Sequence, residues 1–152
     1  MKYVLDTNVF SKMSGPNCNA NIAKWRRTVN DSDLFVTVLT IQEIHKGIGL
    51  LRKNGGVEKL ATASAIEAAF DTVLSQFEER VISLGSLAAR DWGRRLARQG
   101  TKNSNDLGII AIVATLPGAI AVTRNMIDFR HKGVEVLNPF DDPPTMFHDL
   151  ET

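Results

Sequence analysis

The sequence predicts an α/β domain with three layers, α/β/α, in which helices cover both faces of a mostly parallel, five-stranded central sheet. Its 152 residues suit one domain, and 43% hydrophobic with 23% charged residues is ordinary for a chain that buries a core. Short apolar runs alternate with longer segments of helical periodicity. Strands separated by helices imply right-handed crossovers and therefore parallel strands.

Five short apolar runs, bounded by turn-forming residues, are the predicted strands. The first opens directly onto Asp6-Thr7-Asn8, and the second follows the polar turn Asn30-Asp31-Ser32-Asp33. We place the domain at residues 1–140 and a C-terminal tail at 141–152, because Asp141-Asp142-Pro143-Pro144 cannot continue a helix or strand. The strands are expected at residues 2–5, 34–38, 81–84, 119–122 and 134–137.

The segments between these strands have the apolar spacing of helices. In the longest, apolar residues recur every three or four positions, at Ile66, Phe70, Val73 and Phe77. Gly108, within another, costs about 1 kcal/mol relative to alanine in a helix and indicates close helix packing. The helices are expected at residues 21–28, 40–53, 58–80, 86–99 and 106–116.

Charge and cysteine content exclude several classes of protein. The net charge of +1, from 18 basic and 17 acidic residues, excludes nucleic-acid binding through bulk positive charge. Cys18 is the only cysteine, which excludes an internal disulfide framework and a multi-cysteine zinc site. With no apolar run of about 20 residues and no signal-peptide pattern, we expect a cytoplasmic protein without membrane contact.

Four acidic residues fall where ligands bind in such a sheet, at the carboxyl ends of its strands. Asp6 follows the first strand, Glu43 the second and Asp128 the fourth, while Asp106 opens the helix that leads into the fourth. Each also has a local explanation. Asp6 and Asp128 suit turns or caps, Thr40-Ile41-Gln42-Glu43 has the pattern of a capping box, and the helix dipole favours Asp106.

Convergence of these acids requires a compensating charge. Two unit charges about 5 Å apart at an effective dielectric constant near 20 repel by roughly 3 kcal/mol. A hard divalent cation supplies the compensation, and oxygen-only ligands suit Mg²⁺ or Mn²⁺ rather than zinc. Such a site activates a bound water and clamps a phosphodiester, so the expected chemistry is metal-assisted phosphodiester hydrolysis.

These blocks resemble the PIN-domain nucleases, and most closely the VapC-type toxins of bacterial toxin–antitoxin pairs. Five blocks match in order over nearly the whole chain. They are residues 4–9 (VLDTNV), 40–48 (TIQEIHKGI), 105–111 (NDLGIIA), 122–129 (VTRNMIDF) and 136–140 (VLNPF). The resemblance implies a PIN-like fold and a Mg²⁺-dependent endoribonuclease that pairs as a homodimer and is silenced by a separate antitoxin chain.

The resemblance also implies a role for each matching residue. Asp6 and Asp106 would bind the metal directly, while Glu43 and Asp128 would complete the pocket, through water where they do not touch the ion. Amide hydrogen bonds would orient the carboxylates. The polar residues expected around the carboxylates are Thr7, Asn8, Thr123 and Asn125.

An acidic pocket that cuts RNA needs basic groups at its rim, and four are the candidates: Lys46, Arg94, Arg95 and Arg98. Two other functions remain open. A phosphatase with an aspartyl nucleophile typically has a second acid two residues after the first, where this chain has Asn8. A PIN-like scaffold without catalysis would have no need of all four acids.

Overall fold

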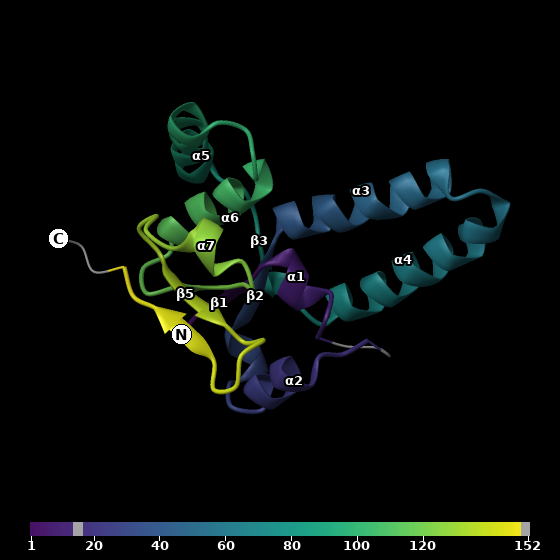
Figure 1. Cartoon of the computed structure of the whole chain (residues 1–152), viewed down its shortest axis with the longest axis horizontal. Coiled ribbons are helices and arrows are strands. Elements are labelled where there is room, and N and C mark those ends of the chain that lie inside the picture. The colour runs from purple at the N-terminus through teal and green to yellow at the C-terminus, as the bar shows by residue number, and fades with distance from the viewer. Residues whose placement is uncertain (14–16, 150–152) are drawn as a thin grey trace.

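A six-stranded sheet forms the centre of the computed structural model, which describes residues 1–13 and 17–149 (Figure 1). The strand order is β3-β2-β1-β4-β5-β6, and every neighbouring pair is parallel except β5 and β6. The strands are β1 (Tyr3–Leu5), β2 (Leu34–Thr37), β3 (Val81–Ile82), β4 (Ile120–Val122), β5 (Glu135–Asn138) and β6 (Thr145–Phe147).

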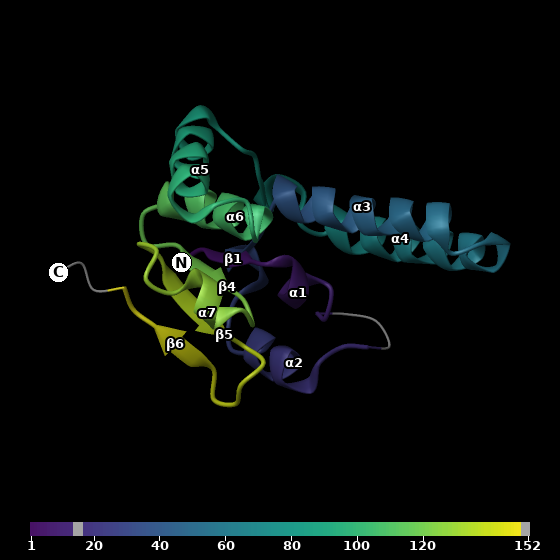
Figure 2. The same cartoon turned by 45° about the horizontal axis from the view of Figure 1, so that its top comes forward.

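Helices cover both faces of this sheet, so the predicted three-layer α/β/α architecture is confirmed (Figures 1 and 2). Three short 3₁₀ turns, Asp31–Asp33, Val57–Lys59 and Glu78–Arg80, lie between the longer elements. The helices are α1 (Thr7–Phe10), α2 (Ala20–Arg26), α3 (Val38–Asn54), α4 (Leu60–Ser75), α5 (Ser86–Gln99), α6 (Ser104–Ala114) and α7 (Met126–Phe129).

Two hydrophobic cores lie on opposite faces of the sheet, because successive side chains along a strand point to opposite faces. Val4 of β1 packs in the core beneath α5 and α6, while the next residue, Leu5, packs in the core with α1, α2 and α4. Ala121 and Val122 of β4 divide in the same way. The short apolar runs of the sequence therefore read as strands buried on both faces.

The sheet has one strand more than the five we expected. Thr145–Phe147 forms β6 and pairs antiparallel with β5, with Leu137 opposite Met146. These residues fall within the segment predicted as a tail. The error arose because Asp141-Asp142-Pro143-Pro144 does break regular structure, but the chain turns back at this break and adds an edge strand.

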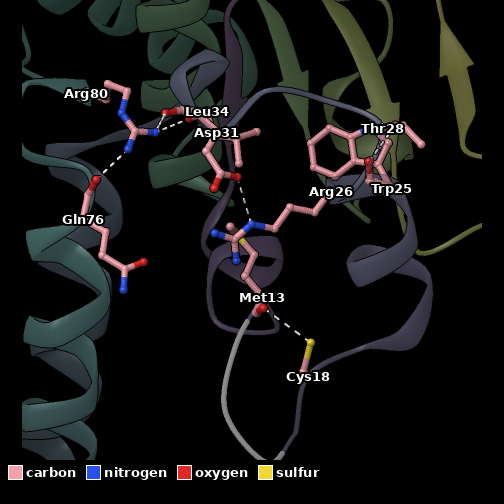
Figure 3. Close-up of polar contacts among 9 residues, drawn as sticks. All are labelled: Met13, Cys18, Trp25, Arg26, Thr28, Asp31, Leu34, Gln76 and Arg80. Atoms are coloured by element: carbon pink, nitrogen blue, oxygen red, sulfur yellow. Dashed lines mark hydrogen bonds and ion pairs between the residues drawn. The ribbon is translucent and has the colours of Figure 1, made fainter.

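The long helix expected at residues 58–80 is shorter in the structure. α4 covers Leu60–Ser75, a 3₁₀ turn precedes it, and Glu78 has a left-handed backbone with φ of 40°. A left-handed residue cannot continue an α-helix. Arg80 then donates hydrogen bonds to the carbonyls of Asp31, Leu34 and Gln76, which ties the end of this helical segment to the start of β2 (Figure 3).

Helices α3 and α4 form a long antiparallel pair that projects from the sheet (Figures 1 and 2). The end of the pair that lies next to the sheet carries the first turns of α3 and the last turns of α4. In the described part of the chain, no helix is both long and apolar enough to span a bilayer.

Gly108 marks the close packing of α6 that the sequence indicated. A Cβ at this position would lie 2.4 Å from Leu39 Cδ1 and 2.9 Å from Trp92 Cε2. Gly108→Ala gains about 1 kcal/mol of helix propensity but overpacks a junction of three helices, which typically costs about 1–3 kcal/mol. We expect a net loss of about 1 kcal/mol in the free energy of unfolding, measured by urea denaturation. A stabilised variant would contradict this packing.

Candidate metal-dependent active site

Asp6 connects β1 to α1 at the carboxyl edge of the sheet. Its side chain is 4% exposed and accepts hydrogen bonds from the Thr7 backbone N–H (2.8 Å), Thr123 Oγ1 (2.7 Å) and Asn8 Nδ2 (3.2 Å). Asp6 also caps α1, so the local explanation holds as well. Three donors therefore fix a nearly inaccessible carboxylate in one orientation.

Glu43 lies on α3, and the capping box predicted for it is wrong. α3 begins at Val38, and its N-cap is Thr37, whose hydroxyl accepts from the Leu39 N–H. Thr40 instead lies buried in the first turn, with its hydroxyl 3.1 Å from that of Thr7. Glu43 is thus free of a capping role, and its Oε1 is buried without a hydrogen-bond partner. An unpaired buried carboxylate oxygen is costly unless something else binds it.

Asp106 and Asp128 are joined by a single amide. Asn125 Nδ2 donates to Asp106 Oδ2 at 3.1 Å and to Asp128 Oδ2 at 2.6 Å. Asn103, which precedes α6 in a left-handed conformation, also donates to Asp128 Oδ2, at 2.9 Å. The amide hydrogen bonds expected of Asn8 and Asn125 are therefore present, and Thr123 binds both Asp6 and the Asn125 backbone N–H.

The electrostatics show that these carboxylates share one environment. Burial raises the pKa of Asp106 to about 7, and the charges of Asp6, Glu43 and Asp128 add to the rise while Asn125 opposes it. Burial also raises the pKa of Asp6 and of Glu43. The negative charge of Asp6 contributes to the rise at Glu43, whereas Thr7, Asn105 and Lys46 oppose it. Like charges are thus concentrated here without full compensation by the protein.

The donor set of this site fits a hard divalent cation that keeps most of its water. Within residues 1–13 and 17–149, no three acidic, histidine or cysteine side chains form a ready-made metal cluster. Mg²⁺ needs none, because it usually binds one or two carboxylates and several waters. A bound cation would offset the mutual repulsion of Asp6 and Asp106 and would give the unpaired Glu43 Oε1 a partner.

The basic residues predicted at the rim divide into three cases. Lys46 lies beside Glu43, in a hollow of about 480 Å³ that also contains Asp106. Arg94 and Arg98 are exposed on α5. They line neither this hollow nor a second hollow that also contains Asp106. Arg95 contradicts the prediction, because it is buried, ion-paired with Asp91 at 2.8 Å and bonded to the Lys132 carbonyl.

Several polar residues at the site were missed by the sequence reasoning. Lys102 and Lys132 line a second hollow with Asp106 and Asp128. Asn105 Nδ2 donates to Gln42 Oε1 at 2.8 Å and so links α6 to α3 across the site. Asn103 and Asn105 flank the predicted Asp106 closely enough in sequence to have been found, whereas nothing in the sequence signals Lys132.

The chain is similar in sequence and fold to several named bacterial proteins. No protein-family model matches the chain. It is 26% identical over 141 residues to the plasmid stability protein StbB of Pseudomonas syringae pv. tomato, covering 91% of this chain and 98% of that protein. It is 27% identical to toxin FitB of Neisseria gonorrhoeae (91% and 99% covered) and 24% identical to the VapC ribonuclease Y4jK of Sinorhizobium fredii (91% and 97%).

Comparison with solved structures also finds similar folds. The chain matches a chain of the DNA-bound VapBC complex of Salmonella typhimurium with a TM-score of 0.68 and 25% identity, over 91% of this chain and 98% of that one. The relationship to VapC-type PIN-domain toxins that the motifs indicated is thereby confirmed.

Proposed function

We propose, for a chain related in sequence and fold to the VapC-type PIN-domain toxins, that it is a Mg²⁺-dependent endoribonuclease and the toxin of a toxin–antitoxin pair. One observation carries the proposal. The buried Asp6 and the half-buried Glu43 and Asp106, all with raised pKa values, meet at the carboxyl edge of a parallel sheet, with the Glu43 Oε1 left unpaired. Perturbed pKa values of this kind concentrate at functional sites.

Each residue of the pocket has a distinct task in this proposal. Asp6 and Asp106 would hold Mg²⁺, or Mn²⁺, directly, and Glu43 and Asp128 would do so through water. The bound cation would lower the pKa of its water and neutralise charge on the phosphodiester.

The surrounding polar groups hold these oxygens in place. Asn125 keeps Asp106 and Asp128 side by side, and Thr123 and Asn8 fix Asp6. Removing a supporting contact of this kind typically lowers metal affinity or activity by about 10- to 100-fold.

The geometry disfavours the phosphatase alternative. In such an enzyme, the residue two positions after the nucleophilic aspartate serves as the general acid. The residue two positions later, Asn8, donates its amide to Asp6 and has no proton to give as a general acid.

The toxin role brings two further partners. One is a cognate antitoxin, as in the VapBC complex that the chain's fold matches. The other is a second copy of the chain, as a homodimer. RNA would be the substrate, and Lys46, which lines the same hollow as Glu43 and Asp106, would contact it.

Cleavage of a mixed RNA pool by the purified protein tests the proposal. We expect cleavage in Mg²⁺, none in EDTA, and a loss of more than about 100-fold in Asp6→Asn and in Glu43→Gln, each of which removes a charge at nearly constant shape. The matched control is Asp71→Asn, which removes an exposed acid on α4. Full activity in Glu43→Gln, or cleavage that survives EDTA, would contradict the proposal.

A further inference from the structure

A polar hollow of about 250 Å³, distinct from the one that contains Glu43, opens beside the carboxylates. Asp106 and Asp128 both line it. The same hollow is also lined by Gln99 at the end of α5, Lys102 from the α5–α6 connection and Lys132 from the turn after α7. Two segments that are distant in sequence, residues 99–107 and 128–132, thus each bring one lysine and one acid to this hollow.

Lys102 and Lys132 do not form ion pairs with the carboxylates of the pocket in the described residues. In the described ranges 1–13 and 17–149, neither Lys102 nor Lys132 lies within ion-pair distance of a carboxylate. The amides of Asn125 and Asn103 serve Asp128 instead. Lysines that merely neutralised the pocket would be expected to pair with the acids they face.

The backbone that carries Lys132 is held firmly. The buried Arg95 donates from Nη1 to the Lys132 carbonyl at 2.8 Å, and its Nε is fixed by Asp91. On the other side, the Gly133 N–H donates to Asp149 Oδ2 at 2.6 Å. The residues on either side of Lys132, His131 and Gly133, both have a left-handed backbone conformation. Arg95, predicted to touch RNA, therefore stabilises the turn that carries a different cation.

We propose that Lys102 and Lys132 form a phosphate subsite, which binds a backbone phosphate of single-stranded RNA next to the bond that is cut. The inference rests on the proposed function, because it assigns part of the substrate to this hollow. Ammonium groups bind phosphate as point charges and release counterions from the strand. Positive charge here also offsets the repulsion between RNA and the neighbouring carboxylates.

RNA binding without cleavage tests the subsite. The Asp6→Asn protein is titrated into a fluorescein-labelled single-stranded RNA of random sequence, and anisotropy gives Kd at several NaCl concentrations in Mg²⁺. We expect Lys102→Gln and Lys132→Gln each to weaken binding several-fold. Each should reduce the slope of log K against log salt by about 0.7, and the double variant by about 1.4.

Lys59→Gln is the matched control, because Lys59 lies in the turn between α3 and α4, at the far end of that helix pair from the sheet (Figure 1). It should leave Kd and slope unchanged. With the wild-type active site, the lysine variants should raise KM and leave kcat nearly unchanged.

The outcomes separate the subsite from the hydrolysis. A double variant that binds like the control, while the wild type cuts RNA, overturns the subsite alone. Lysine-dependent binding by a protein that cuts no RNA supports the subsite and overturns the hydrolysis. A protein that binds no RNA at all overturns the subsite and leaves the hydrolysis without a substrate.

Discussion

Asp106→Asn is expected to abolish RNA cleavage while leaving the protein folded and more stable than the wild type. The substitution removes a proposed direct metal ligand. The loss of cleavage activity should therefore exceed the roughly 10- to 100-fold that is typical when a residue hydrogen-bonded to a ligand is replaced. It also removes a carboxylate that is ionised only with difficulty, since its pKa is raised to about 7. At pH 8 without metal, we expect the free energy of unfolding to rise by on the order of 2 kcal/mol, allowing for partial solvent screening.

Cleavage assays and urea denaturation in EDTA measure the two effects on the same preparation. Asp71→Asn should change neither, because Asp71 is exposed on α4. An Asp106→Asn protein that unfolds, or that is less stable than the wild type at pH 8, would show that this carboxylate is a structural helix-start residue. Retained cleavage would remove Asp106 from the site.

The stability of the metal-free protein should fall as the pH rises from about 4 to about 7. The unfolded Asp106 has a pKa near 3.8 and the folded one near 7, so within this window the folded state binds more protons than the unfolded state. Stability then decreases with increasing pH. The pKa values of Asp6 and Glu43 are raised too, and they act in the same direction.

Mg²⁺ should reverse this trend, because a bound cation stabilises the deprotonated carboxylates. Urea denaturation at pH 5, 6, 7 and 8, with EDTA or with Mg²⁺, gives both curves. The difference between wild type and Asp106→Asn isolates the contribution of Asp106, which should grow between pH 5 and 7 in EDTA. A difference that stays flat over this range, or stability that is independent of Mg²⁺ at pH 8, would contradict the site electrostatics.

The gathering of acidic residues at the carboxyl edge of the sheet could be predicted from the sequence. In a parallel sheet, the residues that follow each strand meet at one edge, so Asp6 and Asp128 needed only correctly placed strands to be brought together. The supporting amides were predictable in part, because Asn8 stands two residues from Asp6 and Asn125 three residues from Asp128. The hydrogen bond from Asn125 to Asp106 spans 19 residues and has no such local signal.

The parts that the sequence did not predict depend on longer-range packing. The α3 start at Val38 follows from Thr37 at the end of a buried strand, and this hides Thr40 against Thr7. The fate of Arg95 depends on Asp91 and on a turn 37 residues away. β6 depends on pairing with β5 rather than on any pattern of its own. Apart from the cap that Thr37 forms on α3, these features are decided by contacts between segments distant in sequence.

The end groups of the cleaved RNA test the proposed metal-activated water most directly. An end-labelled RNA is cut by the wild-type protein in Mg²⁺ in ¹⁸O-labelled water, and the fragments are examined by mass spectrometry. Hydrolysis by water predicts one ¹⁸O in each new terminal phosphate, no 2′,3′-cyclic phosphate, and no fragments in EDTA. Cyclic phosphate ends would show that the ribose 2′-hydroxyl, and not water, is the nucleophile. The same fragments in EDTA would show that no bound metal is needed, and either result would contradict the proposed metal-activated water.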